Sequence, residues 1–468
     1  MNSNLYCIKT ISRNYNENSN TFLKGFHLQH SATCSYPFGF TIFDKVFLPF
    51  VTMIQFDKIK LDNGLTVIVH TDKSTPFVAV NVCYRVGSKH EDPNRTGFAH
   101  LFEHLTFGGS ANVKDFDLAV QRAGGANNAF TSNDLTNYYI TLPANNIETA
   151  LWLESDRMLG PKFSKKGLDV QKKVVIEEFR QRNLNRPYGD VWHLLRDLAY
   201  KVHPYRWPTI GLVPEHIESA GLGDVKDFFF HHYAPNNAVL VISGNIASAE
   251  AFKLAEKWFG DIPSREIAPY LGLPEPLQET DREITVYRDV PIDTFYVAWH
   301  MGSRKDKSFY VLDLLSDILS NGSSSRFEVK LVKEQKLFTE ADAYLSGENE
   351  PGLFVATGKA STGIDIHLAR EKMLEEIMMT VETPITAYEL EKVKNRVESD
   401  LLLNEIGYLE KAIQLASFEI MGDASEINRQ GEKYREVTAE DLLQTANNLF
   451  RTGNRNTLNY LSLQNSKK

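Results

Sequence analysis

The pattern of apolar and polar positions changes character at Met53. Residues 1–52 are rich in Asn and Ser and show no sustained period, whereas strand-like runs follow on either side of Asn63-Gly64. An Asn-Gly pair between such runs is a strong signal for a β-hairpin. We therefore expect the compact fold to begin near Met53. We interpret residues 1–52 either as a disordered extension or as the result of a translation start assigned too far upstream. The alternative is that they form a folded N-terminal lobe.

A similar order of elements occurs twice in the remaining chain. The strand-like run 78–88 precedes the helical run 101–110, and the runs 294–303 and 314–323 repeat this order. Strands return later in each half, at 238–242 and at 353–357. Strands and helices that mix without strict alternation predict an α+β fold. We expect two related domains, each an antiparallel-rich sheet covered by helices.

A polar, Pro-rich stretch over residues 261–282 separates the two repeats. A sequence of this composition is typical of an interdomain linker. We therefore predict a first domain over residues 53–260 and a second over residues 283–465. A chain of 468 residues is long enough for about two to four domains, which accommodates this division.

Charge and cysteine content narrow the class of protein. The net charge of −9 argues against a nucleic-acid-binding protein, which usually carries a basic face. Cys7, Cys34 and Cys83 are too few and too scattered for a disulfide framework. No apolar run approaches the roughly 18 residues that span a bilayer, and residues 38–51 make a poor signal peptide. We expect a cytoplasmic protein without a transmembrane segment, and a periplasmic location is the alternative.

The sharpest chemical signal is the run from His100 to His104, which includes Glu103 and lies in a helical, amphipathic stretch. His100 and His104 are four residues apart and share one face of a helix, with Glu103 on the same side. Zinc favours imidazole nitrogen, and a carboxylate beside a ligand can reach metal-bound water. This H-x-x-E-H order is the inverzincin pattern. The alternative is a pair of His on a helix flank beside a solvated Glu, which is costly in such apolar surroundings.

A catalytic zinc ion needs a third protein ligand and an open position for water. The helical stretch 168–182 offers candidates, because Gln171, Val174 and Glu178 share one stripe and Glu177 is also an acid. A Glu in a helix usually faces solvent, so the residues alone leave the choice of ligand open.

From about Met53 to about residue 460 the chain resembles the pitrilysin/insulinase family of zinc peptidases. It is similar to two-domain members such as the subunits of mitochondrial processing peptidase and their bacterial relatives. The motifs that carry the resemblance are 100–104, 124–131 with Asp134 and Thr136, 153–158, 174–178, 203–205 with Gly211, and 233–238.

The resemblance implies a fold and a set of functional residues. The two domains would form one half of a clamshell that excludes large folded substrates. One zinc ion per subunit would be held by His100, His104 and Glu178, and Glu103 would be the general base. The family also implies that an exposed strand pairs with an extended peptide through main-chain hydrogen bonds. Here that strand comprises Asn127, Asn128, Ala129, Phe130 and Thr131. The alternative is a plain strand edge after a Gly-Gly turn.

Two departures from the family pattern concern the metal motifs. Relatives often carry a Glu seven residues before the distal ligand, where this chain has Gln171. Some bacterial relatives resemble the chain at that position, so we do not interpret it as inactivation. In the second repeat, Asp313, Ser316 and Asp317 stand where the metal motif stands in the first. The second half is therefore expected to be a non-catalytic copy.

A third departure predicts a partner. Homodimeric relatives carry an Arg and a Tyr that bind the substrate carbonyl, and the matching positions here are Val332 and Thr339. Neither side chain supplies a cationic or phenolic donor. We therefore expect a heterodimer with a paralogous subunit that carries the Arg/Tyr pair, in preference to a homodimer.

Together these observations predict a zinc-dependent metalloendopeptidase subunit that hydrolyses peptides or unfolded protein segments. The alternative is a non-catalytic structural or assembly subunit of the same family. The intact set of His100, Glu103, His104 and Glu178 argues against it.

Overall fold

The computed structural model describes residues 53–110, 112–270 and 272–464. The predicted extension over residues 1–52, which includes Cys7 and Cys34, lies outside the described residues. From Ile54 onward the chain is one compact unit. Cys83 is buried and carries a free thiol.

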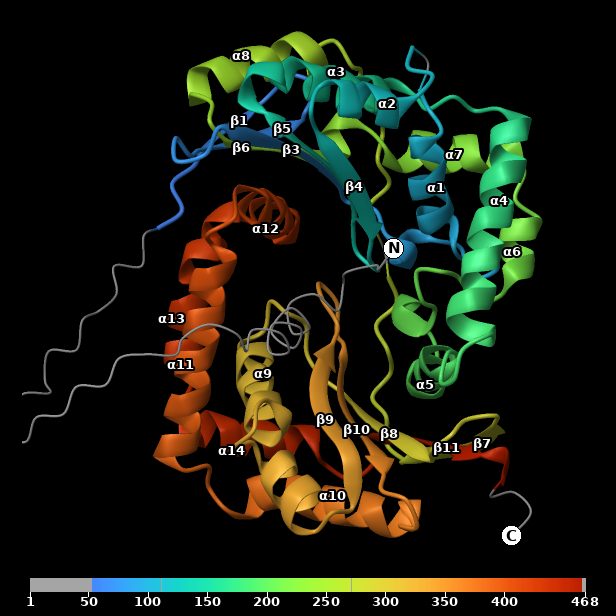
Figure 1. Cartoon of the computed structure of the whole chain (residues 1–468), viewed down its shortest axis with the longest axis vertical. Coiled ribbons are helices and arrows are strands. Elements are labelled where there is room, and N and C mark those ends of the chain that lie inside the picture. Colours follow the sequence, from blue (N-terminus) through green and yellow to red (C-terminus); the bar gives the residue numbers. More distant parts are fainter. Residues whose placement is uncertain (1–52, 111, 271, 465–468) are drawn as a thin grey trace, which may run out of the picture. The chain divides into compact units, whose positions relative to one another are not determined.

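The first half contains a six-stranded sheet in the order β1-β2-β6-β3-β5-β4 (Figure 1). Its strands are β1 (Asp57–Lys60), β2 (Thr66–Thr71), β3 (Phe77–Tyr84), β4 (Ala126–Thr131), β5 (Thr136–Pro143) and β6 (Ala238–Gly244). Only β2 and β6 run parallel; the other neighbouring strands are antiparallel. The sheet is thus antiparallel-rich, as expected.

The hairpin of β1 and β2 forms at the predicted Asn-Gly pair. Gly64 has a φ of 88°, a left-handed conformation that glycine adopts without steric cost. The Asn63 side chain accepts a hydrogen bond from the Leu65 N–H and donates to the carbonyls of Phe259 and Ile262. The turn residue therefore ties the hairpin to the end of a distant helix.

The second half repeats this sheet without the first edge strand, in the order β7-β11-β8-β10-β9. Its strands are β7 (Arg282–Arg288), β8 (Thr294–His300), β9 (Phe338–Ser346), β10 (Leu353–Ala360) and β11 (Arg455–Ser462). The single parallel pair is β7 with β11, which occupies the place of β2 with β6. The shared order and directions agree with two related sheets.

Helices fill the connections within each half. The first half contains α1 (Phe98–Phe107), α2 (Phe116–Arg122), α3 (Ile147–Leu159), α4 (Lys165–Phe179), α5 (Val191–Ala199), α6 (Pro214–Glu218), α7 (Leu222–His232) and α8 (Ser248–Phe259). The second contains α9 (Lys307–Ser320), α10 (Ile366–Glu382), α11 (Ala387–Asn404), α12 (Tyr408–Met421), α13 (Gln430–Arg435) and α14 (Ala439–Leu449). Short 3₁₀ segments are η1 (Ser88–His90), η2 (Ala144–Asn146), η4 (Pro204–Arg206), η5 (Pro235–Asn237) and η7 (Ala424–Arg429), and η3 (Arg180–Leu184) and η6 (Phe327–Glu334) are π-helical.

Each sheet is covered on one face by helices of its own half and on the other by a helix of the opposite half. In β6, Leu240 and Ile242 join the core of the first half, whereas Val239 and Val241 pack against α12. Successive residues of a strand point to opposite faces, so α12 covers the second face. On the second sheet, α5 packs in the same way against β8 and β11. Burial on both faces explains why β6 is apolar along nearly its whole length.

Between α8 and β7, the described residues 260–281 form no helix or strand. The segment is nevertheless anchored, because the Glu275 carboxylate accepts hydrogen bonds from the N–H groups of Lys201, Val202 and His203. The predicted domain boundaries on either side of it stay predictions. No helix among the described residues is long and apolar enough to cross a membrane.

Candidate functional site

The predicted metal motif lies on α1, and its first turn is fixed by a buried carboxylate. Gly97, with a φ of 90°, precedes the helix and provides no side-chain cap. Glu91 instead accepts hydrogen bonds from the N–H groups of Gly97 and Ala99, each at 2.8 Å. A carboxylate at a helix N-terminus satisfies its free N–H groups and complements the helix dipole. Glu91 therefore anchors the helix that carries His100, a role that the sequence pattern did not reveal.

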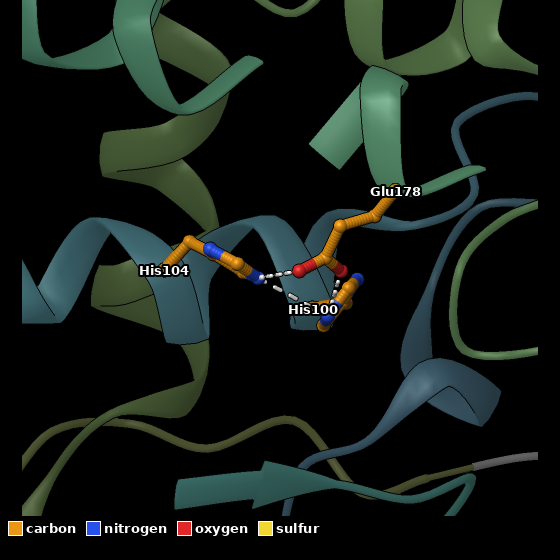
Figure 2. Close-up of side chains that lie close together, drawn as sticks. All are labelled: His100, His104 and Glu178. Atoms are coloured by element: carbon orange, nitrogen blue, oxygen red, sulfur yellow. Dashed lines mark hydrogen bonds and ion pairs between the residues drawn. The ribbon is translucent and has the colours of Figure 1, made fainter. Parts of the chain in front are cut away.

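His100 and His104 on α1 converge with Glu178 on α4 (Figure 2). The two imidazole Nε2 atoms are 3.3 Å apart, and the Glu178 oxygens lie 3.6 Å from His100 Nε2 and 3.7 Å from His104 Nε2. Ligands that bind zinc tetrahedrally at about 2.1 Å are about 3.4 Å from one another. The three side chains therefore fit a zinc ion at these separations, with one Glu178 oxygen facing each imidazole. Of the two acids that the sequence left open, Glu178 joins the cluster, whereas Glu177 is exposed.

The protonation of the cluster also suits a metal. Burial, followed by the charges of His104 and Arg182, lowers the pKa of His100 to about 3. Burial lowers the pKa of His104 as well, against the opposing effects of Glu178 and of a hydrogen bond with Gln171. Both rings are therefore neutral at neutral pH, and a neutral imidazole offers the lone pair that a metal needs. Glu178 Oε2 is buried and has no hydrogen-bond partner, which leaves it available as a ligand.

Glu103 lies on the same helix and is held by β4. Thr131 Oγ1 donates a hydrogen bond of 2.6 Å to Glu103 Oε2. Burial raises the pKa of Glu103 to about 7; the Thr131 hydrogen bond opposes this rise and the Glu178 charge adds to it. A carboxylate with these properties can exchange a proton near neutral pH. Thr131, predicted as a substrate-pairing residue, thus also contacts the predicted general base.

The predicted peptide-pairing run coincides with β4, which is the last strand of its sheet. One side of β4 pairs with β5, and within the described residues no strand covers its other side. Asn127, Asn128, Ala129 and Phe130 are exposed or half-buried, and Thr131 is buried. Such an edge presents backbone N–H and C=O groups to which another strand can add.

Within the part of the second repeat that the structure describes, no equivalent cluster occurs. His100, His104 and Glu178 are the only three His, Cys, Asp or Glu side chains among the described residues whose ligand atoms converge in this way. At the equivalent place on α9, Asp313 accepts a hydrogen bond from the Tyr434 hydroxyl, and Asp317 accepts one from the Asn321 amide. The buried Ser316 donates to a main-chain carbonyl of its own helix.

Val332 and Thr339, which are predicted to stand where relatives carry the Arg/Tyr pair, present no cationic or phenolic donor. Val332 packs against the core of the second half. Thr339 is exposed, and its hydroxyl donates to the Lys359 carbonyl.

Comparison with known proteins identifies the family. Residues 66–211 match the family model described as insulinase (peptidase family M16), and residues 219–397 match that of the peptidase M16 inactive domain. The chain belongs to peptidase family M16. The cluster of His100, His104 and Glu178 lies in the segment that matches the insulinase model, whereas the second match begins before α7 of the first half and runs into the second half.

Named relatives of this M16 chain include zinc proteases. It is 28% identical to zinc protease PqqE of Helicobacter pylori over 401 residues, which cover 84% of this chain and 90% of the relative. It is also 28% identical to the β subunit of the mitochondrial-processing peptidase of Saccharomyces cerevisiae over 218 residues, 46% of each chain.

Solved structures show the same fold. The crystal structure of a protease from Helicobacter pylori superimposes with a TM-score of 0.82 at 27% identity, covering 87% of this chain and 99% of that one. Pitrilysin superimposes with a TM-score of 0.70 at 18% identity, covering 87% of this chain and 45% of that one. The M16 chain thus has the expected two-domain, pitrilysin-like architecture.

Proposed function

We propose that this M16 chain is the zinc-binding subunit of a metalloendopeptidase that cleaves peptides or unfolded protein segments. The observation that supports this most is the convergence of His100, His104 and Glu178 at distances that match tetrahedral zinc, beside a buried Glu103. A structural subunit has no use for this arrangement, so we favour the enzyme over the alternative of a non-catalytic assembly subunit.

In this proposal His100, His104 and Glu178 hold one zinc ion per chain. When bound, zinc would polarise the scissile carbonyl and lower the pKa of a water molecule. Glu103 accepts the proton of the attacking water and returns it to the leaving amine. Thr131 keeps the Glu103 carboxylate in the orientation that this transfer needs, through the 2.6 Å hydrogen bond.

The substrate is an extended polypeptide that pairs with β4. Its main chain would add to the uncovered side of residues Asn127–Thr131, next to α1. Because backbone hydrogen bonds carry no information about side chains, this mode accommodates many sequences. It also requires that the substrate be unfolded where it binds.

A paralogous partner would supply the missing donor for the carbonyl oxygen. Val332 and Thr339 cannot provide it, and we propose that a related subunit carrying an Arg/Tyr pair does so. The isolated chain is then nearly inactive on peptides and gains activity with the partner. Full activity of the isolated chain, or of a homodimer, would contradict this part of the proposal.

Metal dependence tests the proposed function. A quenched fluorescent peptide is incubated with the chain and its partner before zinc removal, after dialysis against a chelator, and after zinc is restored. We expect cleavage to disappear with zinc and to return when zinc is added. Cleavage that continues in the zinc-free protein would overturn the assignment.

The expected cytoplasmic location is a separate proposal, tested by cell fractionation.

A further inference from the structure

A pocket with a volume of about 170 Å³ lies between the start of α9, the end of α12, and η7 with α13. We call it the Arg304 pocket. It contains none of the residues of the candidate zinc site, and the lining residues that matter here are Arg304, Lys305, Tyr310, Phe418, Met421 and Lys433. Sites for small molecules usually measure roughly 300–1,000 Å³. The pocket therefore suits one side chain or a chain terminus rather than a whole cofactor.

The Arg304 guanidinium group forms no ion pair with a described residue, although its charge acts on the buried Glu348 carboxyl. Its Nε atom is shielded from solvent and has no hydrogen-bond partner. The group lies over the rings of Phe418 and Phe309, at 5.4 and 6.0 Å from their centroids. Aromatic faces hold a guanidinium group in place but do not neutralise its charge. A shielded guanidinium N–H without a hydrogen bond is costly, so an anion that enters the pocket would meet an unused donor.

Two of the other charged groups around the pocket, Lys433 and Glu426, form an ion pair. Lys433 Nζ lies 2.6 Å from Glu426 and also bonds to the Tyr310 hydroxyl. Asp423 accepts hydrogen bonds from the N–H and hydroxyl groups of Ser425. Lys305 is exposed and adds a second positive charge. Within the described residues, Arg304 and Lys305 are thus the lining cations without an ion pair, and the Asp423 carboxylate, which also lines the pocket, lies 3.9 Å from Lys58 Nζ.

The pocket is connected to the end of β4 by two hydrogen bonds. The main-chain N–H of Arg304 donates to the main-chain carbonyl of Glu348 at 2.8 Å. The Ser132 hydroxyl donates to the Glu348 side-chain carboxylate at 3.0 Å. Ser132 directly follows Thr131, the last residue of β4. Glu348 therefore links the main chain at Arg304 to the residue that follows the strand proposed to pair with substrate.

We propose that the Arg304 pocket binds a carboxylate of the polypeptide substrate, at a place separate from the scissile bond. The planar guanidinium group of Arg304 matches a carboxylate with two parallel N–H groups. Phe418 and Met421 provide an apolar wall for the carbon atoms next to that carboxylate. The carboxylate belongs to an acidic side chain or to a free C-terminus. The polypeptide nature of the ligand rests on the proposed function, whereas the preference for an anion does not.

Binding of matched peptides tests this proposal. The zinc-loaded Glu103→Gln chain, which binds without cleaving, is titrated with three labelled peptides by fluorescence anisotropy. One contains Asp and Glu and is amidated at its C-terminus, the second has Asn and Gln instead, and the third is the second with a free C-terminal carboxylate. We expect one or both anionic peptides to bind about ten-fold more tightly than the neutral peptide, a ratio that corresponds to 1.4 kcal/mol.

Substitutions then locate the effect. Arg304→Met, in the same background, is expected to bring the anionic and neutral peptides within about two-fold of each other, whereas Arg304→Lys keeps part of the preference. Lys307→Met is the matched control, because Lys307 is exposed, lies outside the pocket and pairs with Asp441. It should leave the preference unchanged. Melting temperatures equal to that of the parent show that each variant is folded.

The outcomes separate the two proposals. Equal binding of all three peptides, or a preference that survives Arg304→Met, overturns the role of the pocket. A preference for the free C-terminus alone, or for acidic side chains alone, supports the proposal and identifies the source of the carboxylate. Failure of the proposed function would instead appear as zinc-independent or absent cleavage by the unmodified chain, which the peptide preference does not affect.

Discussion

Replacing Thr131 by Val is the substitution that best isolates the contact between the substrate-pairing strand and the predicted general base. Valine has nearly the shape of threonine, so the buried end of β4 stays filled and only the hydroxyl is lost. The hydroxyl donates a 2.6 Å hydrogen bond to Glu103 Oε2. Without it the carboxylate loses a donor that fixes its orientation and favours its ionised form.

The expected effect follows from the strength of a hydrogen bond to a charged group. Such bonds contribute about 1.5–3 kcal/mol. If the whole of this energy supports the transition state, Thr131→Val lowers kcat by about 10- to 150-fold. Zinc content should not change, because Thr131 contacts Glu103 and not the metal ligands.

The assay is hydrolysis of a quenched peptide, with zinc content measured on the same samples. Thr131→Ser restores the hydroxyl and is expected to recover most of the lost rate. KM should change less than kcat, because the backbone of β4 that pairs with the peptide remains. A Thr131→Val enzyme as fast as wild type, or a Thr131→Ser enzyme as slow as Thr131→Val, would refute the reasoning.

Three other predictions concern the metal, acid stability and the packing between the halves. Substitutions next to metal ligands weaken binding by roughly 10- to 100-fold, and Glu178→Gln should weaken zinc binding by more than that. A variant that keeps zinc on dialysis as well as wild type would contradict the role of Glu178 as a ligand. Burial, followed by the Lys89 and His232 charges, lowers the pKa of His90 from 6.5 to about 3, so its contribution to the free energy of unfolding is present above pH 6.5 and is lost as pH falls toward 3. His90→Gln should therefore flatten the stability curve between those values in acid titrations followed by circular dichroism, and an unchanged slope would rule out this source. Leu415→Ala on α12 opens a cavity against the first sheet and should cost about 2–5 kcal/mol in chemical denaturation; a loss well below 1 kcal/mol would show that α12 does not stabilise the sheet.

Much of the fold and of the metal cluster could be predicted because the signals are local. The four-residue spacing of His100 and His104 places both rings on one helical face wherever that helix packs. The Asn63-Gly64 pair specifies a hairpin for similarly local reasons. Within the metal cluster, only Glu178 had to be chosen from the resemblance to a family, because a single Glu in a helix does not indicate which side chains it meets.

The contacts that depend on packing between distant segments could not be predicted. Glu91 caps α1 from a preceding loop, and Thr131 reaches Glu103 across 28 residues of chain. The exchange of α5 and α12 between the sheets likewise has no local signal, because an apolar helix face does not indicate which sheet it covers. The strand over 353–357 belongs to β10, whose place in the sheet is that of β5, whereas the counterpart of the strand over 238–242 is β11. The strands of the two repeats correspond in sequence order once β1 is set aside, so the strands over 238–242 and 353–357 are not counterparts of each other.

The most direct test of the central claim is the rate of peptide cleavage by zinc-loaded Glu103→Gln, measured beside the wild-type chain under conditions in which the wild type cleaves. Glutamine keeps the shape of the side chain but cannot accept the proton of the attacking water. We predict one zinc ion per chain in both proteins and cleavage by the wild type alone. A zinc-loaded Glu103→Gln chain that cleaves at the wild-type rate would contradict the account.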